Sequence, residues 1–141
     1  MIVKTVRNKE KTVRKMKALI LQPPYSTDFT KAEQYLEIEK KMLDACDDSA
    51  DIIVCPEACD IPCLAPSNEH YYSFVEKHNA EILEYAAATA KRCNAILFIN
   101  ANSRHEGGLR NTTYAFDRNG NCVGYYYKEH LTPGESFKRK L

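Results

Sequence analysis

The chain has 141 residues, which is enough for one domain or part of one. Hydrophobic residues make up 44% of it and charged residues 28%, a balance that indicates a globular protein and excludes a disordered one. No apolar run approaches the roughly 20 residues of a membrane span, and no apolar segment follows the basic N-terminus as in a secretory signal. We therefore expect a cytoplasmic protein with reduced cysteines and no membrane partner.

The net charge of +1 is unevenly distributed along the chain. Seven basic residues and one glutamate lie within residues 1–17, whereas the remainder is net acidic. A basic head could contact nucleic acid or act as a transit peptide, but a solvated tail is the simpler interpretation. We expect residues 1–16 to form a disordered basic tail, and we predict no nucleic-acid partner because the rest of the chain is acidic.

The first half of the folded part predicts alternating strands and helices. An apolar run over residues 17–22 indicates a short buried strand, which two prolines end. A capping-box pattern at residues 30–33 predicts a helix that continues to about residue 46. A second apolar strand over residues 51–55 is suited to a sheet covered on both faces, and it leaves Glu57 just beyond its carboxyl end.

The middle of the chain predicts a loop, a helix and a third strand. Residues 58–72 show no clear period and are expected to form a loop. A second capping box at residues 73–76 predicts a helix to about residue 92, and residues 95–99 form a third buried strand. The polar residues 102–108 are again expected to form a loop.

A hairpin follows. Residues 112–117 and 122–127 predict two strands, and Asn119-Gly120 predicts a type I′ turn between them. Alternation places Lys128 at the end of the second strand, on the face of Tyr126. The order β-α-β-α-β-β-β predicts an α/β fold with a mixed sheet, whose first three strands are parallel and whose hairpin forms an antiparallel edge.

Polar groups gather where the predicted strands end. Glu57, residues 100–102 and Lys128 all fall near the carboxyl edge of the sheet, where sites of such folds are found. A carboxylate can act as a general base and an ammonium can stabilise an oxyanion, so this pair is typical of a hydrolytic site. Asn111 could line the same pocket, although a role in the turn or strand start explains it equally well.

Three segments together resemble the carbon–nitrogen hydrolase family, also called the nitrilase superfamily. They are Pro56-Glu57 at a strand end, the hairpin Arg-Asn-Thr-Thr-Tyr-Ala-Phe-Asp-Arg-Asn-Gly over residues 110–120, and Tyr127-Lys128-Glu129-His130-Leu131 followed by Glu135. A Pro-Glu pair alone is weak evidence, but the hairpin that runs into Lys-x-His-Leu and a later glutamate is specific. The resemblance spans roughly residues 17–135.

The resemblance implies an α-β-β-α sandwich and hydrolysis of a non-peptide carbon–nitrogen bond through a Glu-Lys-Cys triad. Glu57 would be the general base, Lys128 the triad lysine and Glu135 the second glutamate that holds the lysine. The substrate would be a small-molecule amide, carbamoyl amine or nitrile, with amides favoured. No metal or organic cofactor is implied, and a homo-oligomer is expected.

The nucleophilic cysteine of the family lies on a strand some dozens of residues after the lysine. We therefore expect residues 17–141 to form the N-terminal part of a hydrolase domain, truncated before that cysteine, and the isolated chain to show no turnover. A half-sandwich would leave apolar sheet surface open, so we also expect marginal stability and association through that surface.

Other functions stay open. The series Cys55-x3-Cys59-x3-Cys63 could form a metal-binding module, although metal sites usually show closer pairs. Cys59 could replace the family's nucleophile. The chain could also be an inactive fragment or one half of a split protein that acts only by association. Glu57 and Lys128 could be solvated surface charges, and the tyrosines at 125–127 are expected to serve core packing.

Overall fold

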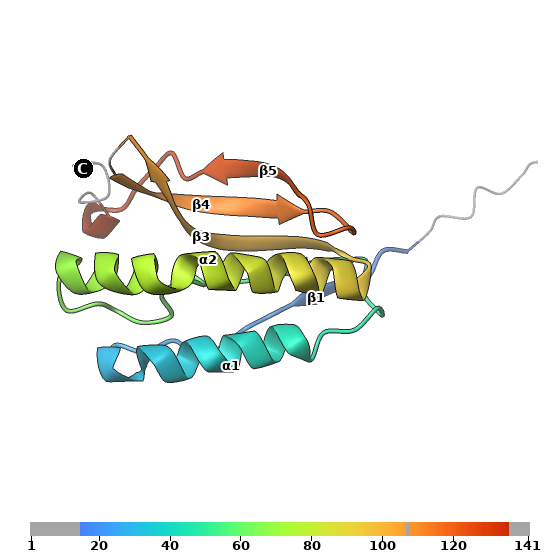
Figure 1. Ribbon diagram of the computed structural model, residues 1–141, viewed down its shortest axis with the longest axis horizontal. Coiled ribbons are helices and arrows are strands. Elements are labelled where there is room, and N and C mark those ends of the chain that lie inside the picture. The colour runs from blue at the N-terminus through green and yellow to red at the C-terminus, as the bar shows by residue number, and fades with distance from the viewer. Residues whose placement is uncertain (1–14, 107, 136–141) are drawn as a thin grey trace, which may run out of the picture.

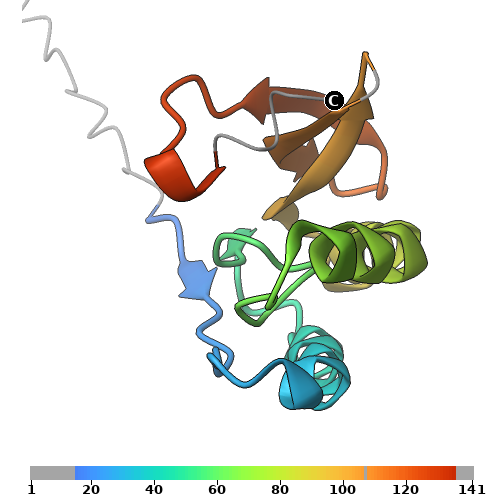
Figure 2. The same cartoon turned by 90° about the vertical axis from the view of Figure 1, so that its left-hand side faces the viewer.

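The computed structural model describes residues 15–106 and 108–135 (Figure 1). The predicted tail over residues 1–16 thus lies almost entirely outside the described residues. Five strands form one sheet in the order β1-β2-β3-β4-β5, and both helices lie on one side of it (Figure 2). The elements are β1 (Ala18–Ile20), the 3-10 helix η1 (Phe29–Lys31), α1 (Ala32–Asp44), β2 (Ile52–Val54), α2 (Asn68–Cys93), β3 (Ile96–His105), β4 (Gly108–Phe116) and β5 (Cys122–Tyr127).

The sheet is mixed. β1, β2 and β3 pair in parallel, whereas β3, β4 and β5 pair antiparallel as consecutive hairpins. The predicted α/β class is confirmed. Among the described helices, none has the length and apolarity that crossing a bilayer would require.

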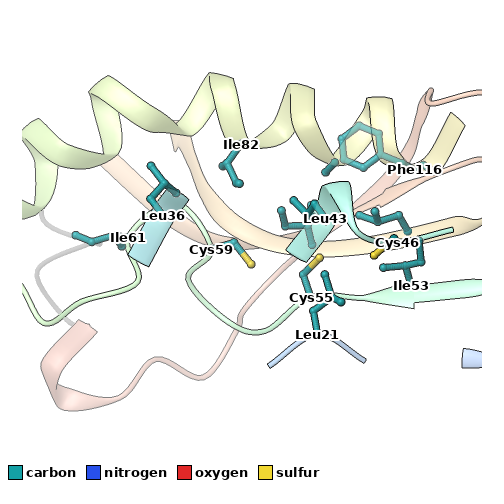
Figure 3. Close-up of a cluster of buried hydrophobic side chains, with 14 of the residues drawn as sticks. Leu21, Leu36, Leu43, Cys46, Ile53, Cys55, Cys59, Ile61, Ile82 and Phe116 are labelled. Atoms are coloured by element: carbon teal, nitrogen blue, oxygen red, sulfur yellow. The ribbon is translucent and has the colours of Figure 1, made fainter. Parts of the chain in front are cut away.

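The core lies between the sheet and the two helices (Figure 3). Ile53 of β2 and Leu97 of β3 are fully buried against Leu36 and Leu43 of α1 and Ile82 of α2. Each such side chain contributes roughly 1.5–3 kcal/mol when it leaves water, so this layer dominates the stability of the described fold.

The opposite face of the sheet has no helix over it within the described part of the chain (Figure 2). Val54 and Phe98 are only half-buried there, and Ile20 at the β1 edge is exposed. The expectation of a buried first strand and a sheet covered on both faces is therefore wrong for the described residues. The apolar runs that suggested it instead leave one apolar face open to solvent, as expected for a half-sandwich.

Both predicted helix starts differ from the structure. The first helical segment is capped by Asp28, whose Oδ1 accepts hydrogen bonds from the backbone N–H and the hydroxyl of Thr30 at 3.1 and 2.6 Å. α2 begins at Asn68, six residues before the predicted start, because its N-cap is Ser67 rather than Ser73, and the Ser67 Oγ accepts from the N–H of His70. Residues 58–67 are therefore loop as predicted, whereas residues 68–72 belong to the start of α2.

The predicted loop over residues 102–108 is largely strand, because β3 continues to His105 and pairs with β4 through a tight turn. The turn between β4 and β5 is also not type I′, since Gly120 but not Asn119 has a positive φ. The Asp117 carboxylate accepts from the N–H groups of Asn119 and Asn121 at 2.9 Å and so shapes this turn.

Candidate active site

Glu57 lies in a short loop directly after β2, and this loop is fixed to β3. The backbone N–H of Cys59 donates to the carbonyl of Asn100 at 2.9 Å, and the N–H of Ala58 donates to the Asn100 side-chain oxygen at 2.8 Å. Ala58 has a φ of 61°, a conformation that costs a residue with a Cβ roughly 1 kcal/mol or more. The strained turn directs the Glu57 carboxylate away from the core, where its side chain is 59% exposed.

The buried carboxylate of Asp60 holds the same loop against the core. Asp60 is fully buried, and its oxygens accept from the backbone and side-chain N–H groups of Asn102 at 2.8–3.0 Å and from Asn79 of α2 at 2.9 Å. Burial raises the pKa of Asp60, although these hydrogen bonds act in the opposite direction. The loop that carries Glu57 is thus tied to both β3 and α2.

Lys128 reaches the same place from the other end of the sheet. It follows β5 directly, and its backbone N–H donates to the carbonyl of Asn111 at 2.9 Å. Its Nζ donates to Glu57 Oε1 at 2.9 Å and to Glu135 Oε2 at 3.0 Å. The structure therefore brings together all three residues that the sequence singled out as a site, across 71 residues of chain in the case of Glu57 and Lys128.

Asn111 of β4 joins the two carboxylates, a role that the sequence did not reveal. Its Nδ2 donates to Glu57 Oε1 at 2.6 Å and to Glu135 Oε1 at 2.9 Å. The side-chain N–H of Asn100 donates to Asn111 Oδ1 at 2.6 Å, which fixes the orientation of the Asn111 amide. The alternation of side chains along the strands could have indicated this role, because it places Asn111 and Lys128 on the same face of the hairpin.

Glu135 is the most enclosed of the three charged residues, with 17% of its side chain exposed. Burial alone would raise the pKa of its carboxyl. Hydrogen bonds from Asn111, from the backbone and hydroxyl of Thr132, and from Lys128 outweigh burial and lower this pKa to about 2. Glu135 is therefore ionised throughout the physiological range and holds the lysine ammonium in place.

The other two charges stabilise one another. The hydrogen bond from Lys128 lowers the pKa of Glu57 by more than burial raises it, and the hydrogen bond from Asn111 adds a smaller lowering effect. The hydrogen bonds to Glu57 and Glu135 raise the pKa of Lys128. Near neutral pH, the cluster therefore contains two carboxylates and one ammonium.

The cluster opens into a pocket of about 740 Å³, a size that suits a small organic molecule. The three charged residues and Asn111 form one side of it. The remaining walls come from the loops after β1 and β2 and from the start of α2. A smaller hollow of about 390 Å³ lies on the open face of the sheet, beside Val54 and Phe98, and Glu57, Asn111 and Lys128 line this hollow as well.

None of the six cysteines, all of which are described, donates a hydrogen bond to Glu57 or accepts one from Lys128. Cys59 is buried, its thiol donates to the carbonyl of Pro56 at 3.2 Å, and burial raises its pKa well above the ordinary value. A thiol in that state is a poor nucleophile, which argues against Cys59 as a replacement. Residues 15–106 and 108–135 also contain no group of three or more His, Cys, Asp or Glu side chains that could hold a metal ion.

The tyrosines of β5 do not serve core packing as the sequence suggested. Tyr125 and Tyr126 are exposed because β5 is the edge strand and neither of its faces is covered in the described part of the chain. Tyr125 packs on Tyr127 with ring centroids 5.1 Å apart. Only the alternation of the strand, with Tyr126 and Lys128 on one face, follows the prediction.

Known proteins resemble this chain in sequence pattern and in fold. Residues 5–141 match the sequence pattern of the family described as "Carbon-nitrogen hydrolase". No curated protein matches the chain significantly.

Several solved structures share the fold. A carbon–nitrogen hydrolase from Helicobacter pylori G27 has a TM-score of 0.61 and 19% identity, over 87% of this chain and 42% of that one. The C. elegans NitFhit protein has a TM-score of 0.66 and 17% identity, over 83% of this chain and 28% of that one. An amidase from Nesterenkonia sp. has a TM-score of 0.61 and 16% identity, over 87% and 46%. The chain thus spans less than half the length of each of these proteins.

Proposed function

This chain belongs to the carbon–nitrogen hydrolase family, and from that premise we propose that Glu57, Lys128 and Glu135 form the charged part of an active site that hydrolyses a non-peptide carbon–nitrogen bond. The substrate is an amide, a carbamoyl amine or a nitrile, with amides preferred. The observation that carries the proposal is the single cluster in which Lys128 Nζ contacts both carboxylates within 3.0 Å. Residues 17–141 are, in this proposal, the N-terminal part of the hydrolase domain.

Glu57 is suited to the role of general base. Its lowered pKa keeps it ionised near neutral pH, so it can accept a proton. Lys128 and Asn111 both donate to its Oε1, and no described residue donates to its Oε2. Oε2 is therefore the oxygen that would take the proton of a nucleophilic thiol, pass it to the departing amine, and then take a proton from the water that attacks the thioester.

Lys128 is suited to stabilise the oxyanion. An ammonium has three N–H donors, and within the described residues two of them are used by Glu57 and Glu135. The third remains for the oxygen of the tetrahedral intermediate. Because Glu135 and Glu57 fix the Nζ position before the substrate arrives, this donor needs no reorganisation during the reaction.

The reaction also requires a thiol next to Glu57. The structure has none there among the described residues, so we propose that the family's nucleophilic cysteine comes from a segment outside this chain. We also propose a homo-oligomer and a cytoplasmic location, and the latter is supported by the six unpaired cysteines.

A second function is favoured by the open face of the sheet. Ile20 is exposed and Val54 and Phe98 are half-buried there, so the chain could act only by association through this apolar surface. The Cys-rich metal module has no comparable support, since no metal-binding group forms among the described side chains.

The test is turnover by a complete protein in which this chain is joined to, or mixed with, the segment that supplies the thiol. Glu57→Gln and Lys128→Ala should each reduce kcat for an amide by about 10²-fold or more, because each removes a group that acts on the reacting atoms. Glu84→Gln and Lys91→Ala on the exposed side of α2 are the matched controls and should leave kcat unchanged. Near-normal kcat in either site variant would contradict the proposed roles, and absence of turnover with every amide and nitrile would favour association alone.

A further inference from the structure

The pocket wall opposite the charged cluster is built from two loops that are fastened together. The loop after β1 and the loop after β2 meet in a short parallel bridge at Ser26 and Cys63. The N–H of Leu64 donates to the carbonyl of Ser26 at 2.9 Å, and the N–H of Ser26 donates to the carbonyl of Pro62 at 3.4 Å. The wall is therefore formed before any ligand binds, rather than by a loop that must close.

This wall is apolar although much of it faces solvent. Tyr25 and Leu64 are 60% and 58% exposed, and both line the pocket. The buried Ile61 and the half-buried Ala65 also line the pocket beside them. Large apolar side chains that remain exposed around a cavity indicate a surface that a ligand covers.

The wall lies close to the proposed base. Tyr25 and Leu64 line the same pocket as Glu57 and Lys128. A molecule whose amide carbon lies at the Glu57 and Lys128 end could therefore place its next carbon atoms against Tyr25 and Leu64.

The charges around the pocket determine which charge the substrate's side group can have. Among the described lining residues, Lys128 is the only lysine or arginine, and its charge is matched by Glu57 and Glu135. The described lining therefore has a net negative charge, which would repel a substrate carboxylate.

We propose that the wall formed by Tyr25, Ile61, Leu64 and Ala65 is a specificity subsite for the uncharged, apolar side group of an amide substrate. The inference rests on the proposed function, because it takes Glu57 and Lys128 as the end of the pocket that receives the amide. It excludes substrates whose side group ends in a carboxylate.

Four amides test the subsite by NMR titration of the full chain with labelled backbone and methyl groups. Acetamide has no side group, and hexanamide has an apolar one. Adipamate and 5-aminopentanamide replace the terminal methyl of hexanamide by a carboxylate and by an ammonium. We expect all binding to perturb signals near Lys128, with hexanamide at least tenfold tighter than acetamide, because several methylene groups leave water. Both charged analogues should bind at least tenfold more weakly than hexanamide, because a charged end group loses hydration against the apolar wall, and the carboxylate also meets the net negative lining.

A pair of variants locates the apolar contact. Leu64→Ser should weaken hexanamide about fivefold or more and leave acetamide unchanged. Val123→Ser is the matched control, because Val123 is equally exposed but lies at the far end of β5 from Lys128, and it should change neither affinity by more than twofold.

The outcomes separate the two proposals. Equal affinity for the four amides at Lys128, or tighter binding of either charged analogue, would overturn the subsite and leave the hydrolase function intact. Hexanamide signals confined to the open sheet face near Phe98 would also overturn it. If no amide perturbs residues near Glu57 and Lys128, the proposed function fails and the subsite fails with it.

Discussion

Glu39 of α1 is a buried acid for which the fold supplies little compensation. Its side chain is 1% exposed, and neither carboxyl oxygen has a hydrogen-bond partner. Burial raises its pKa from 4.5 to about 7; the Cys59 thiol beside it acts in the opposite direction, and the nearby Asp60 charge makes a smaller contribution that raises the pKa. Glu39 is therefore mostly protonated in the folded chain at pH 6, whereas it is ionised in the unfolded chain.

This difference predicts a loss of stability as the pH rises. Below about pH 4.5 both states bind the proton, and Glu39 contributes no penalty. Between pH 4.5 and about 7 the unfolded state loses the proton first, so the free energy of unfolding falls, and above pH 7 the penalty is constant. A pKa shift of this size lowers the free energy of unfolding by about 3 kcal/mol at pH 8.

Replacing Glu39 by methionine, which has a similar volume, should remove the penalty. The gain in unfolding free energy over the parent chain should be about 3 kcal/mol larger at pH 8 than at pH 4. The difference between the two pH values is the useful quantity, because any change in packing is the same at both. Urea denaturation followed by far-ultraviolet circular dichroism measures it, since the chain has no tryptophan for fluorescence.

Glu84→Met on the exposed side of α2 is the matched control and should show the same stability change at both pH values. If Glu39→Met also showed no pH dependence relative to the parent chain, Glu39 would have to be ionised or solvated in the folded state. The reasoning from its burial would then be refuted.

Three further predictions follow from the site and the hairpin. Asn111→Ala should raise the pKa values of Glu57 and Glu135, because each loses a hydrogen bond to its charged form, and unchanged carboxyl titrations in carbon-13 NMR would contradict this. Glu135→Gln should cost about 2 kcal/mol of stability at pH 7, and the loss should vanish as the pH falls from 4.5 toward 2, because the lowered pKa stabilises the fold only where the unfolded carboxyl is ionised. Gly120→Ala should cost about 1–3 kcal/mol in urea denaturation, because φ is +81° and a Cβ would lie 2.6 Å from a backbone carbonyl of α2, whereas Gly124→Ala has open space and should be nearly neutral.

The sequence predicted what local patterns and strand order determine. Apolar runs located the first three strands, although β1 proved to be an exposed edge. The convergence of Glu57 and Lys128 followed from placing both at strand ends. That step needs only the alternation of side chains along a strand and the direction of each strand.

The predictions were wrong or incomplete where another capping residue nearby set the start of a helix, or where contacts between distant residues built the site. Asp28 and Ser67 cap helical segments ahead of the patterns that suggested Thr30 and Ser73 as starts, since several residues in each stretch are able to cap. The Asn111 network depends on side chains from three separate strands and loops. The hairpin pattern places Asn111 on the same face as Lys128, but no spacing in the sequence reveals its hydrogen bonds to Glu57 and Asn100.

The site joins the two halves of the sheet. Glu57 follows a strand of the parallel half, and Lys128 follows the last strand of the antiparallel half, with β3 and β4 between them. A slip of one residue in the pairing of β5 with β4 would turn the lysine to the opposite face and separate it from both acids. The ammonium–carboxylate contact can therefore form only when every ladder between β2 and β5 is in the correct register, so it reports on the completed assembly of the sheet.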